Sequence, residues 1–117
     1  MSSPTSPTSL RAAELQARLE RGEAIQLVDV REDVELELAR FPLAVVHLPL
    51  SRSEAWVGRL EELLNRDRPI AVLCHAGVRS WQFGCWLIEA QGYGQVWNLQ
   101  GGIDAWSVEV DASVPRY

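Results

Sequence analysis

Cys74 and Arg79 stand five positions apart in the stretch AVLCHAGVRSWQFGCWL, which covers residues 71–87. The residues between them are His75, Ala76, Gly77 and Val78. A glycine here lets the backbone adopt a tight curl that would strain other residues. If the curl wraps round the sulfur, backbone N–H groups and the N-terminus of the following helix favour a thiolate. We therefore expect Cys74 to be a nucleophile in a loop that holds a persulfide or an oxyanion.

Several side chains near the cysteine are candidates for supporting it. Arg79 either binds an anionic substrate or pairs with a carboxylate that keeps the loop in shape. Ser80 is placed to cap the helix that follows. His75 either supplies positive charge or a proton, or points to solvent. Asp29 and Arg31 end a buried strand, and either is a candidate to brace the loop by a charged hydrogen bond.

Other residues with chemical side chains have simpler interpretations. Cys85 lies in the next helix without glycine or basic neighbours, so we expect it to be structural. His47 lies among prolines and apolar residues, which indicates a packed or hydrogen-bonded histidine. The acidic run from Glu32 to Glu37 is typical of a solvated helix face.

The elements that position these residues alternate between short apolar strands and amphipathic helices. The strands are expected at 24–30, 44–50, 69–74 and 95–99. This alternation predicts an α/β domain with a central parallel sheet of about five strands and helices on both faces. Ligands bind at the carboxyl ends of the strands in such sheets, and Cys74 falls at that end of its strand.

Hydrophobic spacing and capping residues predict the helices. Ser9 is the expected N-cap of a first helix that ends at Gly22. Residues 32–38 are expected to form one or two helical turns. Ser51 or Ser53 is expected to cap a longer helix, one face of which carries Trp56, Leu60, Leu63 and Leu64.

The whole chain has the size and composition of one globular domain. It has 117 residues, of which 47% are hydrophobic, but no apolar run long enough to span a membrane. The N-terminus lacks the features of a signal peptide, so we expect a cytoplasmic protein. Residues 1–8 are rich in serine, threonine and proline and predict a flexible tail before a domain at 9–117. The segment 108–117 either packs back over the domain or reaches a partner.

Net charge and cysteine content limit the classes of partner and of cysteine-based site that we expect. A net charge of -5 gives no reason to expect nucleic acid, so small molecules or proteins are the expected partners. Two cysteines without a CxxC pair indicate neither a disulfide scaffold nor a zinc site.

Three motifs together resemble the single-domain rhodanese-like sulfurtransferase family, over about residues 9–106. They are LVDVRE at 27–32, CHAGVRS at 74–80 and LQGGIDAW at 99–106. The resemblance implies that Cys74 accepts a sulfane sulfur from thiosulfate or a persulfide and passes it to a thiol or to cyanide. It also implies that residues 75–79 hold the persulfide and that no metal or organic cofactor is needed. The segment RFPLA at 40–44 departs from the family pattern, so no function is carried over to it.

A second departure leaves the sulfur donor open, and two rival functions are also considered. The loop lacks strongly basic residues beside Cys74, so a protein-bound or small persulfide is an alternative donor to thiosulfate. The protein is alternatively a rhodanese-like interaction or persulfide-carrier module without turnover. A cysteine phosphatase or arsenate reductase is disfavoured, since its loop usually holds five residues between cysteine and arginine.

Overall fold

The computed structural model describes residues 6–117 of the chain. The part of the expected tail that covers residues 1–5 lies outside the described residues. Pro7 is buried and Thr8 already belongs to a strand, so ordered structure begins inside the segment expected to be a tail.

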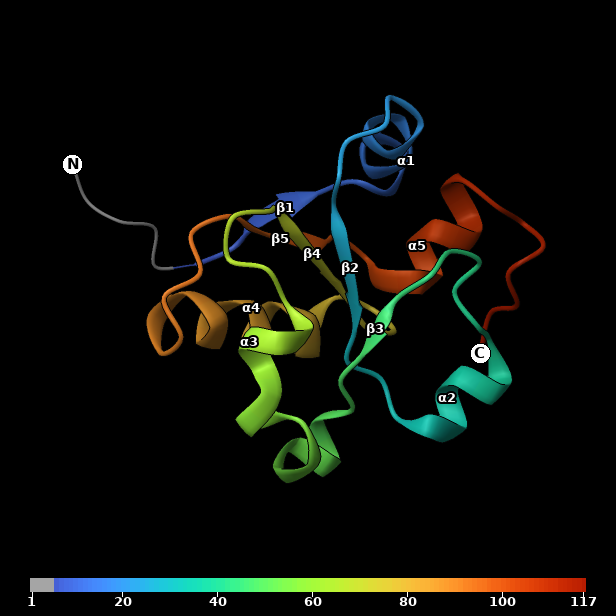
Figure 1. Ribbon diagram of the computed structural model, residues 1–117. Helices are drawn as coiled ribbons and strands as arrows, with labels where there is room; N and C mark the ends of the chain where they lie inside the picture. Colours follow the sequence, from blue (N-terminus) through green and yellow to red (C-terminus); the bar gives the residue numbers. More distant parts are fainter. Residues whose placement is uncertain (1–5) are drawn as a thin grey trace.

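A five-stranded parallel sheet forms the centre of the molecule, in the order β1-β5-β4-β2-β3 (Figure 1). The strands are β1 (Thr8–Leu10), β2 (Gln26–Asp29), β3 (Val46–His47), β4 (Ile70–Leu73) and β5 (Val96–Leu99). The predicted α/β class and parallel sheet are confirmed. The expected positions of β2 to β5 are also correct, although the strands are shorter than their apolar runs.

The expectation that Ser9 caps the first helix is wrong. Ser9 lies in β1 and pairs with Asn98 of β5, and the helix α1 (Ala12–Glu20) begins after Arg11. Pairing with β5 satisfies the backbone groups of this segment and buries Leu10, which outweighs a capping hydrogen bond at the surface.

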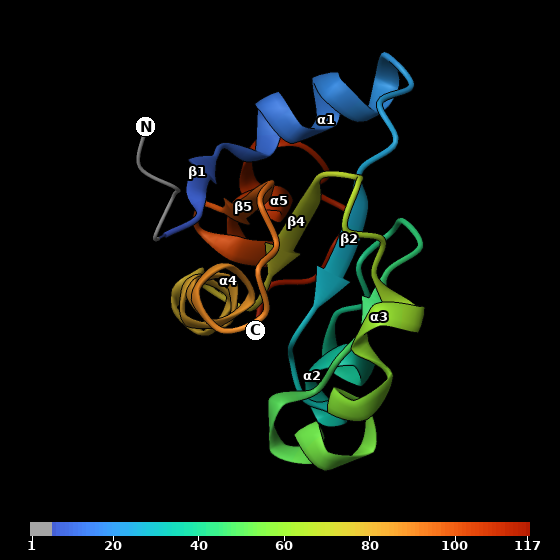
Figure 2. The same ribbon diagram turned by 60° about the vertical axis from the view of Figure 1, so that its left-hand side comes forward.

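Helices cover both faces of the sheet (Figures 1 and 2). One face packs against α1 and α5 (Gly102–Glu109), and the other against α3 (Leu60–Leu63) and α4 (Val78–Glu89). Strand β4 shows how the two cores form, because its side chains alternate between the faces. Ala71 and Leu73 belong to the first core, and Val72 and the following Cys74 to the second.

The long helix expected after Ser51 or Ser53 is replaced by short pieces. Two 3-10 helices, η1 (Leu50–Ala55) and η2 (Val57–Arg59), precede α3. The backbone leaves helical geometry at Trp56, whose indole N–H donates to the carbonyl of Pro49 at 3.0 Å. The Ser51 hydroxyl bonds to Glu32 instead of capping a helix. Burial of the Trp56 ring against Phe83 and Trp86 therefore outweighs helical periodicity.

The carboxyl ends of β2, β4 and β5 meet at one edge of the sheet. Asp29 is in register with Leu73, and Val72 with Asn98. The expected helical turns form α2 (Asp33–Leu38) beyond β2 at the same edge. Within residues 6–117, none of the helices has the length and apolar character needed to cross a membrane.

Candidate active site

The loop after β4 curls round the sulfur of Cys74. This residue is 1% exposed, and its Sγ accepts hydrogen bonds from the N–H groups of Gly77 at 3.1 Å and Ser80 at 3.4 Å. The hydroxyl of Ser80 lies 3.3 Å from the same sulfur. Two backbone N–H dipoles thus converge on Sγ, an arrangement that stabilises negative charge there.

Helix α4 begins earlier than expected. Gly77 is its N-cap, with a φ of 101°, and Val78 is its first residue. Ser80 therefore lies inside the first turn, and the expectation that it caps the helix is wrong. Because the first N–H groups of a helix have no partner within the helix, the Ser80 N–H is free to bond to Sγ. Its hydroxyl faces the sulfur and Asn98.

Asn98 in β5 stabilises the curled loop through two hydrogen bonds. It was not among the site residues predicted from the sequence. Its side-chain amide donates to the carbonyl of Gly77 at 3.0 Å, and its side-chain oxygen accepts from the Ser80 hydroxyl at 2.5 Å. The feature of the sequence that could have identified Asn98 is its position as a polar residue inside the apolar strand QVWNL. Such a buried amide needs partners, and here they are two residues of the loop.

Arg79 pairs with a carboxylate, which is one of the two roles expected for it. Its guanidinium donates two hydrogen bonds of 2.7 Å to the oxygens of Glu35 in α2. These bonds lower the pKa of Glu35 to about 2 and raise the pKa of Arg79. The interpretation of residues 32–37 as a solvated face is therefore wrong for Glu35, which turns toward the loop.

Asp29 and Arg31 form an ion pair of 2.8 Å in which both side chains are 0% exposed. Neither side chain bonds to residues 74–80 within the described chain, so any bracing is indirect. Arg31 donates to the phenol oxygen of Tyr117 at 3.0 Å and to the backbone carbonyl of Glu35 at 3.4 Å.

The end of the chain packs back over the domain, as the first of the two alternatives for 108–117 expects. The ring of Tyr117 stacks on His75, with centroids 4.1 Å apart and planes 12° apart. The Tyr117 hydroxyl donates to Glu35 at 3.0 Å, and burial raises the pKa of this phenol, which keeps it protonated. His75 thus faces an aromatic ring at the loop rim, a contact that the sequence did not predict.

The third motif anchors the backbone of the loop. The N–H groups of Ile103 and Asp104 donate to the carbonyls of Cys74 at 2.9 Å and His75 at 3.2 Å. A Cβ at Gly102 would lie 2.4 Å from both carbonyl oxygens, so only glycine allows this approach. The N-terminus of α5 therefore fixes the base of the loop.

The remaining candidates lie outside the loop. His47 bonds through Nε2 to the backbone carbonyl of Arg31 at 2.7 Å, as expected of a hydrogen-bonded histidine. Cys85 is half-buried in α4, and its structural role stays a prediction.

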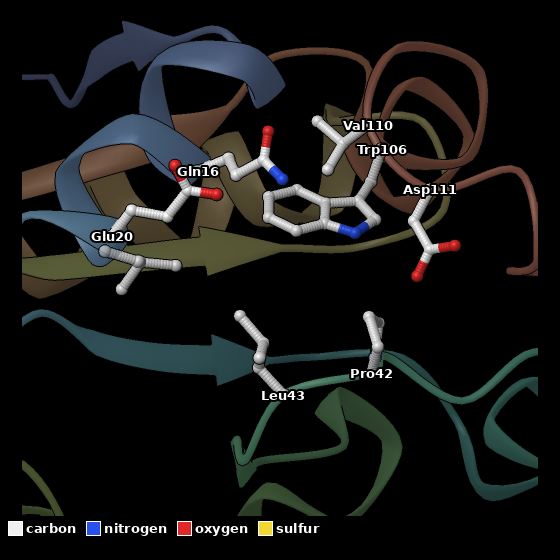
Figure 3. Close-up of a pocket in the computed structure, with 8 residues that line it drawn as sticks. Gln16, Glu20, Pro42, Leu43, Trp106, Val110 and Asp111 are labelled. Carbon is white, nitrogen blue, oxygen red and sulfur yellow. The ribbon is translucent and has the colours of Figure 1, made fainter.

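Two hollows differ in their relation to Cys74. One, of about 390 Å³, lies between α1, α5 and the segment at Pro42 and Leu43, with Trp106 on its wall (Figure 3). It is lined by no described residue of the loop. The other, of about 260 Å³, adjoins the loop and is lined by Gly77, Val78, Trp81, Gln82 and Asn98.

Comparison with known proteins decides the family. Residues 11–109 match the family model of the rhodanese-like domain. The chain belongs to this family. A sulfurtransferase of Allochromatium vinosum is 37% identical to the rhodanese-like domain over 97 residues, which cover 80% of this chain and 81% of that protein. The rhodanese-like domain protein of Staphylococcus aureus has a similar structure, with a TM-score of 0.72, 27% identity, and 94% and 98% of the two chains covered.

A further relative is a larger protein. Rhodanese-like/PpiC domain-containing protein 12 of Arabidopsis thaliana, a chloroplastic protein, is 42% identical over 92 residues. The match covers 79% of the rhodanese-like domain described here but only 30% of the Arabidopsis protein. The similarity therefore concerns one domain of that protein.

Proposed function

We propose that this rhodanese-like domain is a sulfurtransferase that carries a sulfane sulfur as a persulfide on Cys74. One observation carries the proposal: Sγ lies at the carboxyl end of β4, within hydrogen-bond distance of two backbone N–H groups and the Ser80 hydroxyl. Its match to the Allochromatium sulfurtransferase over most of both chains supports the same reaction class.

The reaction has two displacement steps. The Cys74 thiolate attacks the sulfane sulfur of the donor, an Sγ–S bond forms, and the donor's own bond to that sulfur breaks with its electron pair. With thiosulfate, sulfite leaves; with a persulfide, a thiolate leaves. An acceptor thiolate or cyanide then attacks the outer sulfur and Cys74 departs as a thiolate. The hydrogen bonds to Sγ stabilise it in both its attacking and its leaving form.

The loop geometry disfavours a phosphatase. Four residues separate Cys74 from Arg79. In addition, both terminal nitrogens of Arg79 already bond to Glu35, which leaves fewer donors for a tetrahedral oxyanion.

A turnover assay separates the alternatives. With a sulfane donor and cyanide, we expect many molecules of thiocyanate per molecule of protein and none from Cys74→Ser. Cys85→Ser serves as the matched control and is expected to retain turnover. Loading of one sulfur without turnover would instead indicate a carrier module. Release of phosphate from a small aryl phosphate would favour a phosphatase.

A further inference from the structure

We infer that the preferred sulfur donor is an alkyl persulfide, RS–SH, and not the thiosulfate dianion. The inference rests on the proposed function and names its donor class. Two independent features of the entrance carry it: the arginines beside the loop are already paired with carboxylates, and a hollow next to the loop offers apolar surface and neutral amides.

The charges beside Cys74 nearly cancel. The chain contains no lysine, so its permanent side-chain cations are arginines. Three of these lie beside the loop or its supports, and each forms an ion pair. The pairs are Arg79–Glu35, Arg31–Asp29 and Arg116–Asp104, with N–O distances of 2.7, 2.8 and 2.7 Å. The loop itself adds His75 as its one other basic side chain.

The arginines without an ion pair in residues 6–117 are Arg40 and Arg68. Arg68 precedes β4 and thus lies at the opposite end of that strand from Cys74. Arg40 follows α2, and neither arginine forms a side-chain hydrogen bond with residues 74–80 in the described chain. None of the described arginines that support the loop therefore lacks a carboxylate partner.

This balance matters because thiosulfate reacts as a dianion with a thiolate. Like charges repel strongly at bonding distance in a partly buried site. Unpaired cations in a cleft raise the association rate of anionic substrates by about 10- to 1,000-fold, an advantage that this entrance lacks. A persulfide carries at most one negative charge, so it meets less repulsion than the thiosulfate dianion.

The hollow of about 260 Å³ next to the loop suits the organic group of such a donor. Val78 is 66% and Trp81 36% exposed, so they present apolar surface that is free to contact a ligand. Gln82 and Asn98 contribute amides to the same lining. Gly77 lines this hollow and its N–H donates to Sγ, so the hollow and the loop around the sulfur share a residue.

The step balances without an added oxidant or reductant. The Cys74 thiolate attacks the terminal sulfur of RS–SH, and the new Sγ–S bond replaces the S–S bond of the donor. The proton stays on the transferred sulfur, so the products are Cys74–S–SH and the thiolate RS⁻.

The test compares rates of sulfur loading onto Cys74 by rapid quenching and intact-mass measurement. The donors are thiosulfate, the persulfide of N-acetylcysteine methyl ester, and serum albumin carrying a persulfide. We expect at least one persulfide to react about tenfold faster than thiosulfate, and the ratio of the two persulfides tells a small source from a protein-bound one. Faster loading by thiosulfate would overturn the inference and leave the proposed function standing. Loading by no donor would instead defeat the proposed function.

Two pairs of variants test the two features separately. Ala76 is an exposed loop residue, and Ala76→Lys adds an unpaired cation where Ala76→Gln adds only bulk. We expect thiosulfate to load the lysine variant roughly tenfold faster than the glutamine variant. Trp81→Ala is expected to lower the persulfide rate more than the thiosulfate rate, and Trp81→Phe to restore the ratio. Equal rates within each pair would contradict the inference.

Discussion

Arg79 and Glu35 lie 44 residues apart in the sequence, and their side chains meet in two hydrogen bonds of 2.7 Å. The pair joins the loop around Cys74 to α2, which also supplies the backbone carbonyl that Arg31 contacts. The shape of the loop therefore depends on a helix that none of the three sequence motifs includes beyond its N-cap.

Glu35→Gln tests this pair through its pH dependence. The hydrogen bonds from Arg79 lower the pKa of Glu35 from 4.5 to about 2, so the ionised form stabilises the fold above about pH 4.5. That contribution is lost as the pH falls through the folded-state pKa. We expect the variant to lose about 2 kcal/mol of unfolding free energy at neutral pH, after allowance for solvent screening. Urea denaturation should show this difference shrinking in acid, and a difference independent of pH would contradict the account.

Tyr117→Phe and Tyr117→Ala separate the hydrogen bonds of this residue from its stacking. Phenylalanine keeps the ring on His75 but leaves the donor of Arg31 without its phenol partner. We expect each step to cost about 1 kcal/mol of unfolding free energy. NMR shifts of the His75 ring should change in the alanine variant and stay close to the parent value in the phenylalanine variant. Unchanged shifts in both would argue against the stack.

Asn98→Ala removes the link between β5 and the loop. The carbonyl of Gly77 and the hydroxyl of Ser80 each lose a buried partner. We expect a loss of about 1–3 kcal/mol in unfolding free energy, together with faster hydrogen exchange of the Gly77 amide. A variant with parent-like stability and exchange would show that the loop holds its shape without Asn98.

Gly102→Ala and Gly22→Ala form a matched pair at two glycines with positive φ, 62° and 83°. A Cβ at Gly102 would collide with the carbonyls of Cys74 and His75, whereas a Cβ at Gly22 would meet nothing within 4 Å. We expect the Gly22 variant to lose about 1 kcal/mol and the Gly102 variant more than about 3 kcal/mol, or to fail to fold. Similar melting temperatures for the two variants would contradict the close approach at Gly102.

Much of the fold could be predicted from local patterns in the sequence. The apolar runs at 24–30 and 69–74 predicted the central strands, because buried parallel strands need continuous apolar residues. The spacing of Cys74, Gly77 and Arg79 predicted the loop. By contrast, β1 is a three-residue edge strand whose pairing with β5 leaves almost no periodicity in the sequence.

The contacts that support the loop around Cys74 could not be predicted from the spacing of residues in the sequence. Glu35 lies in an acidic run whose members look alike in sequence, and only the packing of α2 turns this one toward Arg79. Tyr117 reaches His75 and Arg31 through the course of the chain end, which no local signal specifies. Long-range pairs of this kind depend on tertiary structure, whereas the succession of strand, loop and helix around Cys74 could be predicted from local sequence.

The central claim is that Cys74 carries the transferred sulfur, and intact-protein mass spectrometry after incubation with a sulfane donor tests it most directly. We predict a mass increase of one sulfur atom that is removed by cyanide, retained in Cys85→Ser and absent from Cys74→Ser. An unchanged mass with every sulfane donor, or an increase that survives in Cys74→Ser, would contradict it.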